Sequence, residues 1–157
     1  MDTDLPYVDE HSVLVPAPAM AVWRSLAAVM TRSPAGSSAA MGLLLATEPR
    51  RAGGTPFEVG STITGFAVTS AVPGRLVELT GRHRFSRYRL VMTLAEQSGG
   101  TLLSARSYAE FPGPHGFVYR QLVIGTGGHR LVVAALLRSV RRHARKNSAG
   151  AGNPDQG

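Results

Sequence analysis

The spacing of apolar and polar residues predicts a short strand followed at once by a helix near the N-terminus. Residues 8–15 alternate between two sets of side chains, although neither face of this strand is cleanly apolar. Pro16 ends the strand, and Pro18 suits the first turn of a helix, where its missing N–H has no intrahelical partner to lose. Residues 19–31 then form a predicted helix, with Val22, Leu26 and Trp23 on or beside its apolar stripe.

A run of strands is predicted in the middle of the chain. Residues 61–72, 75–85, 87–96 and 101–111 are rich in alternating apolar side chains. The separators between these segments are short, which favours antiparallel neighbours because parallel pairing needs long crossover connections. Residues 39–46 are apolar throughout, and periodicity alone fits them to a helix or a strand.

Side-chain alternation gives the predicted sheet an apolar inner face and an arginine-rich outer face. The inner set of residues 75–85 and 87–96 comprises Val77, Leu79, Gly81, His83, Phe85, Tyr88, Leu90, Met92 and Leu94. In residues 61–72 the bulkier and therefore inner set is Phe66, Val68 and Val72. In residues 101–111 two alternatives stay open, an apolar inner set of Leu103, Ala105, Ala109 and Phe111 or a polar one of Leu102, Arg106, Tyr108 and Glu110.

The chain after Pro114 has helical character up to about Lys146. Its predicted apolar stripe repeats every three or four positions and consists of Val118, Leu122, Gly125, His129, Val132, Leu136 and Val140. Three glycines interrupt this stripe, and we expect a kink or close packing against the sheet near Thr126.

Length and composition narrow the class of protein. The 157 residues suit one domain, residues 1–146, and the small and polar tail, residues 147–157, is expected to be disordered. The chain has no cysteine, which excludes disulfides, thiolate metal sites and cysteine nucleophiles. No HExxH motif or closely spaced His/Asp cluster suggests a metal site, so we expect neither a metal site nor a cofactor.

The net charge of +7 raises the question of an anionic partner. Part of the excess lies near the end of the last predicted helix, at Arg138, Arg141, Arg142, Arg145 and Lys146. Cations near a helix C-terminus are favoured by the helix dipole, and a solvated helix end is the default interpretation. No run approaches the roughly 18 apolar residues of a membrane span, and the acidic N-terminus is unlike a secretory signal, so we expect a cytoplasmic protein.

The order of elements resembles a known superfamily. Pro-Ala-Pro-x-x-x-Val-Trp at residues 16–23, PGRLVEL at residues 73–79 and the long C-terminal helix are similar to START-related polyketide cyclases, dehydrases and lipid-transfer proteins, the SRPBCC group that includes the birch-pollen allergen. This resemblance implies an α+β helix-grip fold, in which a curved antiparallel sheet wraps a long C-terminal helix. It also implies an internal cavity for an apolar or aromatic ligand.

The candidate site residues are those expected to face this cavity. The ligand-binding candidates are Trp23, Phe66, Phe85, Leu90, Met92, Arg106, Tyr108, Phe111, Tyr119, Leu122 and Val132. The candidate acid and base groups are His83, Tyr88 and His129, because a neutral imidazole near a phenol could serve enolisation, aldol cyclisation or dehydration of a polyketone. The alternative for His83 and Tyr88 is a hydrogen-bonded polar pair, and for His129 a packed core residue.

Three hypotheses of function follow. The leading one is binding of a hydrophobic or aromatic small molecule, lipid- or polyketide-like, by a monomer or homodimer. The alternative is a cofactor-independent polyketide cyclase or dehydratase that uses the His and Tyr groups. A nucleic-acid or anionic-surface binder is the weakest of the three, and no specific nucleic acid is expected as a partner.

Overall fold

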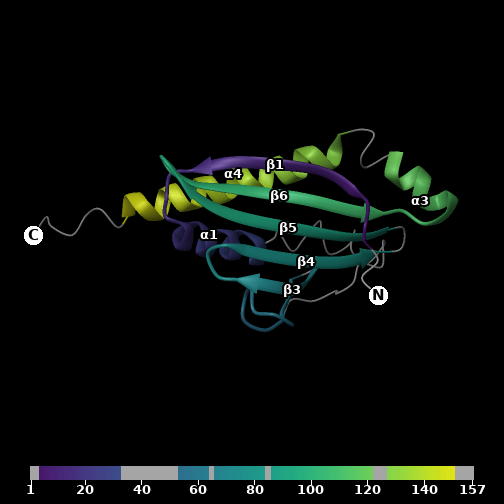
Figure 1. Ribbon diagram of the computed structural model, residues 1–157, viewed down its shortest axis with the longest axis horizontal. Helices are drawn as coiled ribbons and strands as arrows, with labels where there is room; N and C mark the ends of the chain where they lie inside the picture. Colours follow the sequence, from purple (N-terminus) through teal and green to yellow (C-terminus); the bar gives the residue numbers. More distant parts are fainter. Residues whose placement is uncertain (1–3, 33–52, 64–65, 84–85, 122–126, 151–157) are drawn as a thin grey trace, which may run out of the picture.

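A six-stranded antiparallel sheet forms one layer of the protein in the computed structural model, which describes residues 4–32, 53–63, 66–83, 86–121 and 127–150 (Figure 1). The strands lie in the order β1-β6-β5-β4-β3-β2. The elements are β1 (Tyr7–Val15), α1 (Ala19–Thr31), β2 (Thr62–Ile63), β3 (Phe66–Val72), β4 (Leu76–His83), β5 (Ser86–Gln97), β6 (Gly100–Glu110), α3 (Gly113–Arg120) and α4 (Gly128–Gly150).

Helices α1 and α4 form the second layer and contact each other and the sheet. Helix α4 lies against β1, and α1 lies against β5 and β6 (Figure 1). We call the side of the sheet that faces these two helices the inner face. This arrangement confirms the α+β fold class, with an antiparallel sheet and a long C-terminal helix. No helix in the described residues is both long and apolar enough to cross a bilayer.

The strand-to-helix start has the predicted bounds, because local hydrogen bonds turn the chain where the prolines stop the strand. Pro18 precedes the first helical residue with extended backbone, and its carbonyl oxygen accepts bonds from the N–H groups of Ala21 and Val22. The buried hydroxyl of Thr101 donates to the Ala17 carbonyl oxygen at 2.7 Å. This bond ties the turn to β6.

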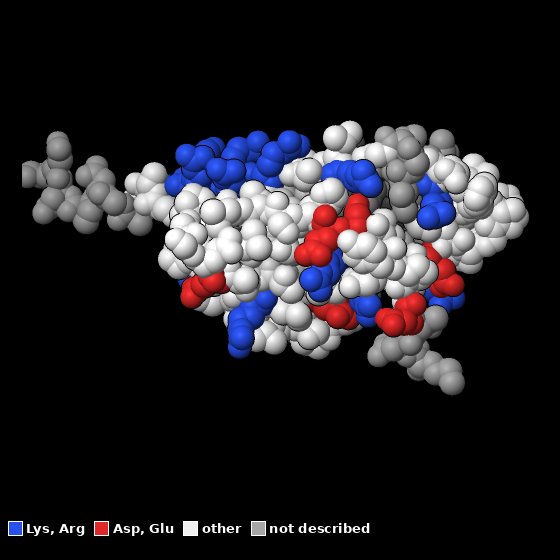
Figure 2. Space-filling model, turned by 45° about the horizontal axis from the view of Figure 1, so that its top comes forward, with Lys and Arg blue, Asp and Glu red and all other residues white. Residues whose placement is uncertain are grey.

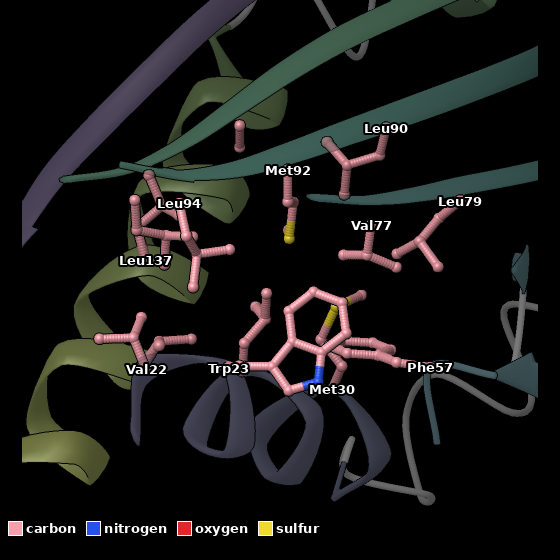
Figure 3. Close-up of a cluster of buried hydrophobic side chains, with 14 of the residues drawn as sticks. Val22, Trp23, Met30, Phe57, Val77, Leu79, Leu90, Met92, Leu94 and Leu137 are labelled. Carbon is pink, nitrogen blue, oxygen red and sulfur yellow. The ribbon is translucent and has the colours of Figure 1, made fainter. Parts of the chain in front are cut away.

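The core lies between the inner face and the two helices (Figure 3). The Trp23 ring contacts the edge of the Phe57 ring with centroids 5.1 Å apart. Figure 3 shows Trp23 and Met30 on α1 pointing toward the β5 side chains, with Leu137 of α4 beside Leu94. The largest fully buried apolar side chains are Leu26, Leu79, Met92, Leu103, Val15, Val22, Val68, Val77 and Val140.

The predicted strand at residues 61–72 is wrong in two respects. It is two strands, because Ile63 of β2 pairs with Phe66 of β3 and the chain therefore reverses between them. The expected inward position of Val72 is also wrong, since its side chain is 47% exposed. The register of β3 with β4 shifts between Val68 and Ser70, and one extra residue in a strand exchanges the two faces beyond it.

The single C-terminal helix of the sequence prediction is two helices, α3 and α4. Gly127 has a left-handed φ of 75° just before α4 begins. Val118 and Val132 are exposed, so their predicted inward positions are wrong, whereas Val140 of the same predicted stripe is buried as predicted. The buried residues of α4 are Val133, Leu137, Val140 and Ala144. Helix α4 also continues to Gly150, past the predicted end near Lys146 and through residues 147–150 of the predicted tail.

Candidate functional site

The inner face differs between its two ends. Around Val15, Leu94 and Leu103 it is apolar, fully buried and covered by α1 and α4. Toward the opposite end the inner positions carry half-buried aromatic and polar groups. We call this set the candidate site and define it as Asp9, His11, Phe66, Tyr88 and Ser107.

An aromatic pair forms one side of the candidate site. Tyr88 of β5 is directly opposite Gly81 of β4, and the pairing of Ala67 with Thr80 puts Phe66 of β3 on the other side of Gly81. Gly81 has no side chain, so the two rings meet across it. Their centroids are 5.2 Å apart and their planes 72° apart, an edge-to-face contact.

The aromatic pair is continuous with the buried apolar layer. Leu90 and Met92 follow Tyr88 at alternate positions of β5, and both are buried. Leu90 is opposite Leu79, and Met92 is opposite Val77. The candidate site is therefore the partly exposed border of the core, and an apolar group bound against the rings would contact these side chains next.

A carboxylate–imidazole pair forms the other side. His11 Nε2 lies 3.1 Å from Asp9 Oδ2, and the two side chains are 27% and 12% exposed. His11 is opposite Ala105 and Asp9 is opposite Ser107, which are both buried inner positions of β6. With the proton on Nε2, His11 donates to Asp9 and keeps Nδ1 as an acceptor.

The two sides lie apart on the inner face. Strand β6 separates β1 from β5, and the register of these strands places Asp9 level with Leu90 and His11 level with Met92. Asp9 and His11 therefore lie farther from Tyr88 than two strand spacings, which measure roughly 10 Å. No three His, Cys, Asp or Glu side chains gather as a metal ion would require in the described part of the chain.

Sequence reasoning missed Asp9 and His11 because the alternation of residues 8–15 did not identify an inner face. The useful signal was the Asp-x-His spacing, since residues two apart in a strand share a face. Only the pairing of β1 with β6 shows that this face is the inner one.

The position of β6 in the sheet shows which of the two faces of residues 101–111 is the inner one. Arg106 is exposed on the outer face, where its Nε donates to Glu10 Oε2 at 3.0 Å. This hydrogen bond raises the pKa of Arg106 above its usual value. The ring of Tyr108 lies under the Arg89 guanidinium at 4.6 Å and contacts Tyr7 edge-on. Both residues therefore stabilise cross-strand contacts on the side of the sheet away from the helices.

Other predicted site residues have varied positions. Trp23 is buried in the core, Phe111 is half-buried after the end of β6, and Val132 points away from the sheet. The Cα of His83 is opposite Ser86, two pairs beyond Gly81 and Tyr88. Phe85 and Leu122, and the side chains of His83, Tyr119 and His129, lie outside the described part of the structure.

Comparisons with known proteins identify the fold. No family model and no curated protein matches the sequence. Three solved structures are similar over most of the chain. A conserved protein from Geobacillus kaustophilus has a TM-score of 0.57 and 16% identity, covering 87% of this chain and 94% of that one. Protein MLL2253 from Mesorhizobium loti has a TM-score of 0.56 and 13% identity, covering 88% and 96%.

The third structure is Ara h 8.0201, a Bet v 1-like protein. Its TM-score is 0.56 at 8% identity, and the match covers 88% of this chain and 97% of that one. At these identities the likeness is one of fold alone. The strand order, the antiparallel pairing and the C-terminal helix agree with it, and the protein therefore has the helix-grip fold of Bet v 1-like proteins.

Proposed function

We propose that the protein binds a hydrophobic or aromatic small molecule, lipid- or polyketide-like, between the inner face of the sheet and α4. The observation that carries this proposal is the half-buried pair of Phe66 and Tyr88 at the border of the apolar layer. An aromatic ligand stacked there exchanges contact with water for contact with two rings and with Leu90. The resemblance to START-related proteins implies the same class of ligand.

The polar groups at the far side give such a ligand an orientation. A mostly apolar site with a few placed polar groups is the usual composition of a small-molecule site. His11 and Asp9 lie one above the other on β1, where a hydroxyl group at the ligand's polar end could donate a hydrogen bond to His11 Nδ1 or to the Asp9 carboxylate. The apolar end of the ligand would then contact Phe66 and Tyr88.

Substitution of the aromatic pair tests the proposal. We expect Phe66→Ala and Tyr88→Ala each to weaken binding of a neutral fluorescent probe, N-phenyl-1-naphthylamine, by about tenfold or more, since each removes an aromatic contact and its buried area. Val72→Ala on the outer face of the same strand is the matched control and should bind like the wild type. A neutral probe is chosen because the chain carries a net charge of +7.

Wild-type stability gives an independent readout. At about 100 times its dissociation constant, a ligand that binds only the folded state adds roughly 2.7 kcal/mol to the free energy of unfolding. If fatty acids, polyketide-like aromatics and the neutral probe all fail to bind or to raise the melting temperature, the proposal is wrong. Equal affinity in all three variants would place the ligand elsewhere.

A second candidate function is a cofactor-independent cyclase or dehydratase, and the hydrogen bond between His11 and Asp9 favours it. An aspartate that orients an imidazole supports a general base, which could take a proton from the carbon between two carbonyls of a polyketone. If His83 is the base instead, the phenol of Tyr88 on the neighbouring strand could donate a hydrogen bond to the resulting enolate. His83 and His129 remain further candidates for the base.

Turnover separates the enzyme from a binding protein. With a polyketone substrate, loss of the true base should lower kcat by roughly 100-fold or more while probe binding is retained. His11→Ala, His83→Ala and His129→Ala are compared with His115→Ala, a histidine on the exposed start of α3. Full activity in the first three variants would exclude these residues as the base.

A further inference from the structure

Helix α4 carries an unusual charge pattern. Within Gly128–Gly150 it has six cationic side chains, Arg130, Arg138, Arg141, Arg142, Arg145 and Lys146, and no acidic one. All six are exposed. Figure 2 shows Lys and Arg side chains gathered over the part of the molecule where the C-terminal half of α4 lies.

These cations differ from Arg89 and Arg106 of the sheet in having no acidic partner among the described residues. On the outer face of the sheet, Arg106 pairs with Glu10 and Arg89 with Asp4. Among the described residues, the α4 cations form no ion pair, and the bond that Arg142 makes is to the Ser139 hydroxyl at 3.1 Å. The sheet arginines contribute to folding contacts, whereas the α4 cations leave a positive field directed at solvent.

The helix dipole does not account for this clustering. Its attraction for cations falls off within the last turn of a helix. Because α4 runs to Gly150, its last turn has no basic residue, and Arg138 lies three turns before its end. These charges are solvated, as expected from the sequence, but they lie before the last turn of α4, where the dipole would favour them.

The exposed face of α4 also has an apolar half. Leu131 and Val132 are 68% and 69% exposed at the first turns of the helix. Leu131, Arg138 and Arg142 follow the helical repeat and share one face, opposite the buried side chains of Val133 and Leu137. One helix face thus presents apolar side chains at one end and cations at the other.

We propose that this face of α4 docks on an anionic lipid bilayer surface. Anionic headgroups complement the unpaired cations, and the interfacial region accepts Leu131 and Val132 while long arginine side chains reach the headgroups. A nucleic acid would complement the charges but would leave the exposed leucine and valine without a favourable environment. This proposal does not depend on ligand binding at the candidate site.

Vesicle flotation with the full chain tests the docking surface. The probes are phosphatidylcholine vesicles with and without about one third phosphatidylserine. The wild type should bind the anionic vesicles and not the neutral ones. The triple variant R138Q/R142Q/R145Q should partition about 100-fold more weakly, from the typical contribution of each cation near an anionic surface.

A control variant with the same net charge tests whether the location of the cations matters for binding. The variant R24Q/R75Q/R87Q also loses three positive charges, at exposed positions on α1, the β3–β4 turn and β5, and should bind like the wild type. Double substitution of Leu131 and Val132 by serine should weaken binding to anionic vesicles several-fold.

Three outcomes would overturn the proposal. They are equal binding of the two triple variants, binding that does not fall when salt is raised from low to moderate concentration, and tight binding to duplex DNA or RNA without binding to vesicles. The salt series uses only the wild type, so it tests the docking proposal even if a variant fails to fold.

Discussion

Replacing Gly100 by alanine is expected to lower the free energy of unfolding by about 3 kcal/mol or more. Gly100 begins β6 with a φ of 142°, and a Cβ there would lie 2.1 Å from the carbonyl oxygen of Val15. That oxygen already accepts the Ala17 N–H at 2.8 Å, so it cannot move without opening the turn between β1 and α1. Denaturant unfolding followed by Trp23 fluorescence measures the loss.

Gly99→Ala separates the clash from backbone strain. Gly99 also has a positive φ, 89°, but its nearest neighbour is the end of the Leu14 side chain at 3.6 Å. Its substitution should cost only the strain of the left-handed backbone, about 1 to 2 kcal/mol. Equal losses in the two variants would show that Gly100 does not touch the turn.

Leu137→Ala is expected to destabilise the protein by about 2 to 5 kcal/mol, while Leu131→Ala on the same helix should change stability by less than about 0.5 kcal/mol. Leu137 is 2% exposed and lies in the core between α4 and the sheet, whereas Leu131 faces solvent. Both substitutions replace leucine by alanine on the same helix. The difference between the two losses of stability therefore shows which face of α4 packs against the sheet. A larger loss at Leu131 than at Leu137 would show that the opposite face of α4 packs against the sheet.

Much of the fold could be predicted because local signals and tertiary structure agree. Pro16 disfavours continuation of the strand and Pro18 suits the start of a helix, and residues 19–31 have the expected bounds. The alternation in β4 and β5 also placed Val77, Leu79, Leu90 and Met92 correctly on the buried side. The short separators between these strands correctly predicted their antiparallel pairing.

The other features of the fold and of the candidate site depend on structural details that residue type alone does not determine. A bulge between Val68 and Ser70 reverses the faces of β3, and nothing in that sequence marks it. In α4, Val140 of the predicted stripe is buried, but Val133 and Leu137 face the core in place of Val132. In the candidate site, Tyr88 and Phe66 were predictable from alternation, but their contact depends on Gly81 between them, and the inward position of His11 depends on the pairing of β1 with β6.

The central claim is that an apolar ligand lies between the inner face and the helices, and methionine methyl NMR tests it most directly. Met92 is buried on β5 and Met30 on α1, whereas Met20 is 45% exposed outside this layer. With ¹³C-methyl-methionine labelling, saturating amounts of N-phenyl-1-naphthylamine should shift the Met92 and Met30 resonances and leave that of Met20 unchanged. Saturable binding that shifts only Met20, or that shifts none of the three, would contradict the claim.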